Sequence, residues 1–247
     1  MPKVLDKFKG MIKKEVGDGF IQLKLPKHIA IVTKGKTLWA KKHNIPIEEA
    51  YQKSFSLIRS IVMNAIRLNI PIITFYLLST NMIESEKYSI MMDQTKEFFD
   101  DIVRDFIKVN KVKISVIGKW YDLPGRVVDS IKTALDLTKD NEEFFLNLAI
   151  NYDGQEEIVD AVKLIARQIK AGKLDADSID IGLIKENTYS SYFIPPDLII
   201  VNGPTKMTNG LLLWDSPKSQ IYFTNKLWPD FDKVEFMDAI KEYQKGV

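Results

Sequence analysis

The sequence predicts an α/β protein with one open, mostly parallel sheet of six strands flanked by helices. Apolar runs of strand length alternate along the chain with segments of helical periodicity, which is the order that parallel βαβ units require. Several of these runs are nearly continuous in Ile, Val, Leu and Phe, as strands buried on both faces are. The 247 residues, of which 45% are hydrophobic, suffice for one large domain with a substantial core.

Each predicted strand is a short apolar run bounded by turn residues. The runs are His28–Thr33, Ile72–Ser79, Lys113–Gly118, Phe144–Asn151, Leu198–Gly203 and Ile221–Thr224. The amphipathic helices predicted between and after them span about Pro46–Leu68, Ser85–Val109, Pro124–Thr138, Gln155–Ala171 and Lys233–Tyr243. Ligands of open parallel sheets bind beyond the carboxyl ends of the strands. We therefore expect function at Thr33-Lys34, Ser79-Thr80, Asn151-Tyr152 and Asn202-Gly203.

The first 20 residues are predicted to form an N-terminal basic amphipathic helix, with residues 21–247 as a single domain. Its apolar face comprises Val4, Leu5, Phe8, Met11 and Ile12, and lysines cover the rest. Such a helix can lie on an anionic membrane surface. Because five apolar residues make a modest anchor, we favour a helix packed on the domain and keep peripheral membrane contact as the alternative.

Composition excludes several classes of function. The net charge of +2 lacks the basic surplus of a nucleic-acid-binding protein, so no nucleic-acid partner is predicted. The absence of cysteine excludes disulfides, thiolate catalysis and Cys-zinc sites, and two histidines are too few for most triads or metal clusters. The sequence shows no signal peptide and no apolar run near 18 residues, so we expect a cytoplasmic protein.

The stretch from His28 to Ala40 predicts a strand, a turn and a helix, with Gly35 in the turn between Lys34 and Lys36. A turn of this kind in an α/β protein often holds a phosphate on backbone N–H groups and basic side chains. A lysine pair in a loop is as often a solvated turn. The residues alone leave both interpretations open.

Several short sequence motifs between Lys27 and Tyr243 occur in an order and at separations that are typical of one protein family. They include Pro26-Lys27-His28-Ile29-Ala30-Ile31, Gly35 with Trp39-Ala40-Lys41-Lys42, Ser79-Thr80, Asn147-Leu148-Ala149-Ile150-Asn151-Tyr152, Pro196-Asp197-Leu198-Ile199-Ile200, Tyr222-Phe223-Thr224 and Leu227-Trp228-Pro229-Asp230-Phe231. In these blocks and their spacing the chain resembles the cis-prenyltransferases, the undecaprenyl diphosphate synthase family. The resemblance implies a six-stranded parallel sheet, a dimer, and a hydrophobic tunnel between the sheet and two helices.

Members of that family extend an allylic diphosphate with isopentenyl diphosphate, using Mg²⁺ and arginines to hold and stabilise the diphosphates. This chain departs from the family at those positions. Lys34 replaces the aspartate that assists ionisation through Mg²⁺, and Gln220 replaces the second Mg²⁺ ligand, a glutamate. Val201 and Met207 replace two arginines, and Asn209 replaces a serine. Because an ammonium repels Mg²⁺, we expect no cofactor and assign no catalytic or metal-binding residue.

Substrate-binding residues are predicted from the loop and from the resemblance together. They are Lys34, Gly35, Lys36, Thr37, Ser79, Asn81, Met92 and Phe99. The loop residues could hold a diphosphate without metal. Met92 and Phe99 belong to the Met- and Phe-rich segment Ser85–Val109, which could line a tunnel. For that segment ordinary core packing is the alternative.

The resemblance and the departures from it lead to three candidate functions. We favour a non-catalytic subunit or regulator of cis-polyprenyl diphosphate synthesis, working as a homodimer or as a heterodimer with a catalytic cis-prenyltransferase. The alternatives are a binding protein for polyprenyl diphosphate or another apolar phosphate, and an active prenyltransferase with a rebuilt site. Removing one electrostatic group of this kind typically costs about 10²–10³-fold in rate, and this chain lacks several.

Overall fold

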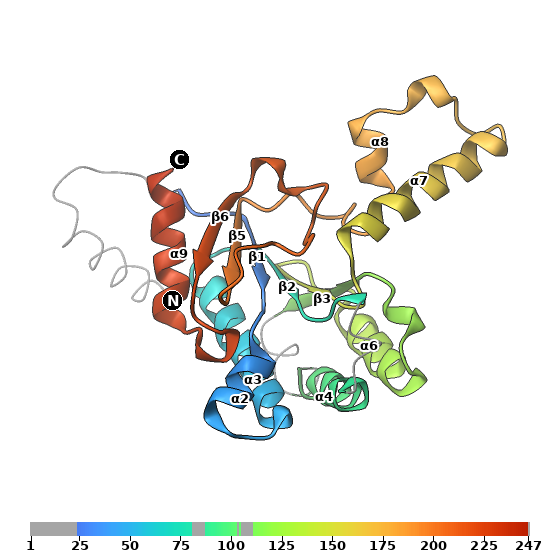
Figure 1. Cartoon of the computed structure of the whole chain (residues 1–247). Coiled ribbons are helices and arrows are strands. Elements are labelled where there is room, and N and C mark those ends of the chain that lie inside the picture. The colour runs from blue at the N-terminus through green and yellow to red at the C-terminus, as the bar shows by residue number, and fades with distance from the viewer. Residues whose placement is uncertain (1–23, 81–86, 103, 105–110, 247) are drawn as a thin grey trace.

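A computed structural model of the chain describes residues 24–80, 87–102, 104 and 111–246. It contains one six-stranded sheet in the order β3-β4-β2-β1-β5-β6 (Figure 1). The strands are β1 (His28–Val32), β2 (Ile72–Tyr76), β3 (Val112–Ile117), β4 (Phe144–Ala149), β5 (Leu198–Asn202) and β6 (Gln220–Thr224). Each neighbouring pair is parallel. The predicted α/β fold is therefore confirmed, and the sheet is parallel throughout.

The helices alternate with the strands, as the apolar periodicity predicts. They are α2 (Lys36–His43), α3 (Ile47–Arg67), α4 (Tyr88–Asp101), α6 (Gly125–Thr138), α7 (Gly154–Lys170), α8 (Ile181–Glu186) and α9 (Lys233–Lys245). Short 3₁₀ turns are η3 (Trp120–Asp122), η4 (Ala176–Ser178), η5 (Ser216–Lys218) and η6 (Trp228–Asp230). The predicted helix over residues 1–20 lies outside the described residues, as does part of the segment Ser85–Val109.

The two faces of the sheet are covered differently. Ile29 and Ile31 of β1 face a larger core, to which α3, α4, α6 and α9 contribute. Ala30 and Val32 face a smaller core, which Tyr152 closes together with residues that precede β5 and follow it. Side chains alternate between the faces of a strand, so both faces of β1 are apolar and the strand is fully buried. This burial explains its continuous apolar sequence.

Two predicted strands extend beyond the observed ladder. Strand β2 ends at Tyr76 and β4 at Ala149, although apolar residues follow both. Leu77 and Leu78 stay buried, but their N–H groups both donate to Ala149 O, at 3.0 and 3.3 Å, instead of continuing the regular pairing. Ile150 is also buried beyond the strand end. Hydrophobicity therefore marks burial at these positions, whereas the hydrogen bonds set where the strand stops.

An arm, which we define as residues 162–186, extends away from the sheet (Figure 1). The outer part of α7 forms one side of the arm, and the chain returns through η4 and α8. Asp153 begins α7 by accepting hydrogen bonds from the N–H groups of Gln155 and Glu156. Several apolar side chains of the arm are exposed, among them Ile181 at 77%.

Candidate functional site

The order of the strands places a topological switch point between β1 and β5. The connections that leave β1 and enter β5 go to opposite sides of the sheet, and ligands of open α/β sheets bind at such a point. Lys34 follows β1, and Gly203 follows β5 with a positive φ of 90°. A Cβ atom at Gly203 would lie 3.4 Å from the Cβ of Lys34. The amide of Asn202, fully buried at the end of β5, has no hydrogen-bond partner among the described residues.

Lys34 bridges the two loops that follow these strands. Its Nζ donates to the hydroxyl of Thr205 at 3.3 Å and to the carbonyl of Thr205 at 3.5 Å, and it also donates to the carbonyl of Met207. Partial burial lowers the pKa of the Lys34 ammonium. The side chain therefore ties the end of β1 to the loop that follows β5.

Lys36 is the more deeply buried cation. It is the first residue of α2, and its side chain folds back under the loop, leaving the residue 9% exposed. Its Nζ donates to the carbonyl of Thr33 at 2.8 Å and to the hydroxyl of Thr33 at 3.0 Å, and lies 5.9 Å from the ring centroid of Tyr51. Burial lowers its pKa to about 7. Among the described residues no carboxylate pairs with it.

The turn between the two lysines requires glycine. Gly35 has a φ of 100°, which other residues rarely adopt. A Cβ there would lie 2.7 Å from Leu227 Cδ2 and 3.3 Å from Leu227 Cα, so the loop packs tightly on the segment after β6. No side chain caps the first turn of α2, and Thr37 in that turn is exposed. This is the arrangement of backbone N–H groups that binds anions in other α/β proteins.

The structure gathers some of the predicted substrate residues and separates others. Residues 34–37 form one continuous loop and helix start. Ser79 lies past the end of β2, the neighbour of β1, where it forms a single bridge with Tyr152. Asn81 lies outside the described residues. Met92 and Phe99 are 1% and 0% exposed within the larger core. That Met92 and Phe99 line a tunnel stays a prediction.

The positions at which this chain departs from the family lie in different parts of the structure. Val201 is buried in the smaller core, while Met207 and Asn209 are exposed on the loop after β5. Gln220 begins β6 opposite Leu198, which in turn pairs with Ile29. It therefore lies level with Ile29, two strands from β1 and five residues before Lys34, an offset of roughly 16 Å along the strand direction at about 3.3 Å per residue.

The donor set at the end of β1 does not fit Mg²⁺. Position 34 presents an ammonium, which has the same sign of charge as the metal and no lone pair to offer. Position 220, the other family ligand position, lies at the opposite end of the sheet within this chain. In the part of the chain that the structure describes, no group of three or more His, Asp or Glu side chains is arranged to hold a metal ion.

A second polar cluster, which sequence reasoning missed, joins α7 to the segments that flank β5. Glu157 of α7 is fully buried and accepts hydrogen bonds from the hydroxyl of Tyr152 at 2.6 Å and from the N–H of Ser190 at 3.1 Å. Burial raises the pKa of Glu157, and burial likewise raises the pKa of Tyr152. The hydroxyl of Tyr152 accepts the N–H of Leu212 at 3.1 Å.

An ion pair completes this second cluster. Asp215 accepts hydrogen bonds from Lys185 Nζ at 2.6 Å and from Ser190 Oγ at 2.7 Å. Lys185 also donates to the carbonyl of Ser190 at 2.7 Å. Tyr152 and Glu157 lie in segments that the sequence predicts to be structured, a strand end and an amphipathic helix. Lys185 and Asp215 lie in short polar stretches without periodicity, so no sequence signal indicates that these four residues meet.

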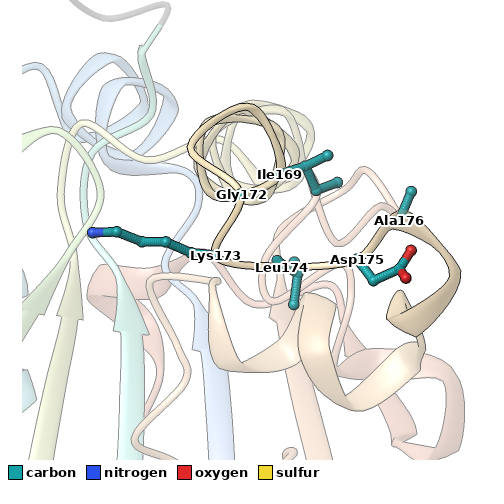
Figure 2. Close-up of a pocket in the computed structure, with 6 residues that line it drawn as sticks. All are labelled: Ile169, Gly172, Lys173, Leu174, Asp175 and Ala176. Atoms are coloured by element: carbon teal, nitrogen blue, oxygen red, sulfur yellow. The ribbon is translucent and has the colours of Figure 1, made fainter.

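A hollow of about 540 Å³ lies at the outer end of the arm, far along the chain from Lys34. Its lining consists of Ile169 and residues 172–176 (Figure 2). The charged side chains of Lys173 and Asp175 point in opposite directions there (Figure 2). They do not converge on a common ligand position, so we assign no chemistry to this hollow.

Comparison with known proteins gives consistent matches over most of the chain. A sequence profile of the family described as "Putative undecaprenyl diphosphate synthase" matches residues 32–246. An isoprenyl transferase of Oceanobacillus iheyensis is 32% identical over 223 residues, covering 90% of this chain and 88% of that protein. An isoprenyl transferase of Streptococcus mutans is 37% identical over 227 residues, covering 89% and 90%.

A solved structure matches the fold. The crystal structure of lavandulyl diphosphate synthase from Lavandula x intermedia, in complex with dimethylallyl diphosphate, aligns with a TM-score of 0.86 and 28% sequence identity. The match covers 89% of this chain and 95% of that one. None of the helices that the structure describes is both long and apolar enough to cross a membrane.

Proposed function

Because the chain belongs to the undecaprenyl diphosphate synthase family of isoprenyl transferases, we propose that it is a non-catalytic subunit or regulator of cis-polyprenyl diphosphate synthesis. One observation carries this proposal. The Lys34 ammonium stands where the family has its metal-binding aspartate, and hydrogen bonds to Thr205 and Met207 engage it internally. An ammonium there repels the divalent ion that would stabilise a departing diphosphate.

The surface chemistry supports a role in an assembly. Strand β6 is an edge of the sheet, and Ile221 and Phe223 on it are 44% and 39% exposed. Val159 and Val162 of α7 are also exposed. An exposed sheet edge that carries apolar side chains, as β6 does, is a surface on which another chain can pack. We therefore propose a dimer, either with a second copy of this chain or with an intact cis-prenyltransferase. Trp228 and Phe231, by contrast, are buried within this chain.

The test measures incorporation of isopentenyl diphosphate by this chain alone, by an intact family member from the same organism alone, and by the two mixed. We expect no turnover from this chain, a complex on co-purification, and a changed rate or product length in the mixture. Turnover by this chain alone would overturn the proposal. So would the absence of both a complex and an effect on the intact enzyme.

A second function, binding of a prenyl diphosphate without metal, is favoured by Lys36. A buried ammonium without an acidic partner is costly, and an anionic ligand would neutralise it. Lys34 and the uncapped start of α2 add positive potential beside it. Calorimetry with farnesyl diphosphate, in EDTA and then in Mg²⁺, tests this binding. We expect equal affinity in both, and binding that requires Mg²⁺ would contradict it.

A further inference from the structure

We propose that Lys36 is a proton gate for the diphosphate site, which holds its anion only while the buried amine of Lys36 carries a proton. The inference rests on the metal-free diphosphate binding proposed above. The new element is that binding at alkaline pH takes up a proton. The affinity for diphosphate therefore decreases as the pH rises.

The first step is the geometry of the ammonium. A lysine ammonium has three N–H donors. Two of them are taken up by the carbonyl and hydroxyl of Thr33, at 2.8 and 3.0 Å. The third has no acceptor among the described residues. The side chain is more than nine-tenths buried, so water does not replace that acceptor freely. One donor and one unbalanced charge therefore remain, and the charge attracts an anion bound on the loop above it.

The second step is the charge around Lys36. The charged and titratable groups on the elements around Lys36 are Lys34 after β1, Lys41, Lys42 and His43 on α2, Glu48, Glu49, Tyr51, Lys53, Arg59 and Arg67 on α3, and Lys226 and Asp230 in the segment after β6. Asp230 accepts from Trp39 Nε1 at 2.6 Å, and no hydrogen bond or ion pair joins Glu48, Glu49 or Asp230 to Lys36. Lys53 Nζ lies 4.6 Å from the Trp39 ring centroid. These groups leave Lys36 without an acidic partner, and Lys34 adds like charge.

The third step links the charge to pH. Burial lowers the pKa of Lys36 to about 7, so the free site is largely uncharged at this position above neutrality. An anion on the loop favours the protonated amine and raises its pKa. By linkage, binding above about pH 7 takes up a proton, and the affinity declines by up to about tenfold per pH unit.

The experiment is calorimetry with farnesyl diphosphate in EDTA between about pH 7.5 and pH 9, where the terminal phosphate is already ionised. Repeating each titration in buffers of different ionisation enthalpy gives the number of protons taken up. Lys36→Gln removes the charge, and Lys36→Arg keeps a charge that does not titrate in this range. Lys41→Gln, at an exposed lysine of the same helix, is the matched control.

For the wild type and Lys41→Gln we expect uptake of about one proton near pH 8.5 and an affinity that falls about tenfold per pH unit. Lys36→Gln should bind at least about tenfold more weakly with no proton uptake, and the affinity of Lys36→Arg should be independent of pH.

Wild-type binding without proton uptake would overturn the gate while leaving the diphosphate site intact. Unchanged proton uptake in Lys36→Gln would also overturn it. A wild type that binds no diphosphate at any pH would overturn both proposals. The wild-type proton count alone decides if the variants do not fold.

Discussion

The cluster around Glu157 and Asp215 and the loop around Lys34 and Lys36 both bury charged side chains, but only the first contains both signs. Asp215 pairs with Lys185 at 2.6 Å, and the carboxylate of Glu157 is hydrogen-bonded on both oxygens. In the loop, both lysines bond to uncharged carbonyl and hydroxyl groups only. The first cluster is complete within the chain, whereas the loop lacks an anion.

This difference separates a structural role from a binding role. Groups that satisfy each other stabilise the fold, and removing one of them leaves its partner buried and unpaired. A buried cation without an opposite charge costs stability instead, and proteins retain such groups where function needs them. Removing Asp215 and removing Lys36 should therefore change stability in opposite directions.

The largest effect is expected at the ion pair. Asp215→Ala should lower the free energy of unfolding by about 4 kcal/mol, because it leaves the Lys185 ammonium and the Ser190 hydroxyl without their acceptor. Urea denaturation measures this loss. Asp136→Ala, at an exposed aspartate 3.9 Å from Lys139, should change stability by less than about 0.5 kcal/mol. A loss below about 1 kcal/mol for Asp215→Ala would refute the structural role of the cluster.

The next effect is the pH dependence due to His28, another buried group whose partners lie within the chain. Its Nδ1 donates to Ile194 O at 2.7 Å, so Nε2 accepts from the hydroxyl of Thr74 at 2.7 Å. Burial lowers the pKa of His28 to about 4. Between about pH 6.5 and 4 the unfolded chain binds the extra proton, so stability falls by about 3 kcal/mol as the pH is lowered.

Urea denaturation at about pH 7 and about pH 4 tests this dependence on His28→Gln, which lacks the titrating group. The difference in stability between the wild type and His28→Gln should shrink by about 3 kcal/mol on going to the lower pH. His43→Gln, at the exposed end of α2, is the matched control because it removes the other histidine and leaves His28 in place. An equal loss of stability between the two pH values in the wild type and in His28→Gln would show that His28 is not the group responsible.

Most of the fold was predictable because it depends on local pattern. The strands are buried on one or both faces and so read as apolar runs, and α3 and α6 bury one apolar face each. The outer part of the arm was not predicted as structured. Helix α8 spans Ile181–Glu186, has no buried residue and is too short to show a period. Strand ends were overestimated because Leu77 and Ile150 remain buried after pairing stops.

The site was only partly predictable because burial depends on distant residues. Sequence placed the loop correctly at the end of β1, since a strand, a glycine and a helix follow each other there. It could not distinguish Lys36 from Lys34. Lys36 is buried beside Tyr51 of α3, in a loop whose Gly35 packs on Leu227, and no local pattern connects positions so far apart. The distance between Gln220 and Lys34 likewise depends on strand register.

A third effect has the opposite sign. Lys36→Met should raise the free energy of unfolding by about 2 kcal/mol at neutral pH, less than the roughly 5 kcal/mol of the full pKa shift because the hydrogen bonds to Thr33 are lost. The unfolded chain binds the extra proton between about pH 7 and 10.5, so the gain should vanish as the pH rises. Lys41→Met, on the exposed side of α2, should show no such gain. Destabilisation by Lys36→Met at neutral pH would mean that Lys36 is a structural group.

The smallest effect concerns Lys34, which is half-buried and is hydrogen-bonded to the loop after β5. Lys34→Gln should cost about 1 kcal/mol, because it removes a charged donor to the carbonyl groups of Thr205 and Met207, and the partial exposure of the site lets water replace that donor. Limited proteolysis of residues 204–210 should become faster, whereas Lys206→Gln, at an exposed lysine in the same loop, should leave the rate unchanged. Because the ammonium of Lys34 is bound to the loop after β5 and that of Lys36 keeps a free donor, Lys34→Gln should weaken diphosphate binding less than Lys36→Gln does. The reverse order would assign the anion to Lys34 and make Lys36 the supporting residue.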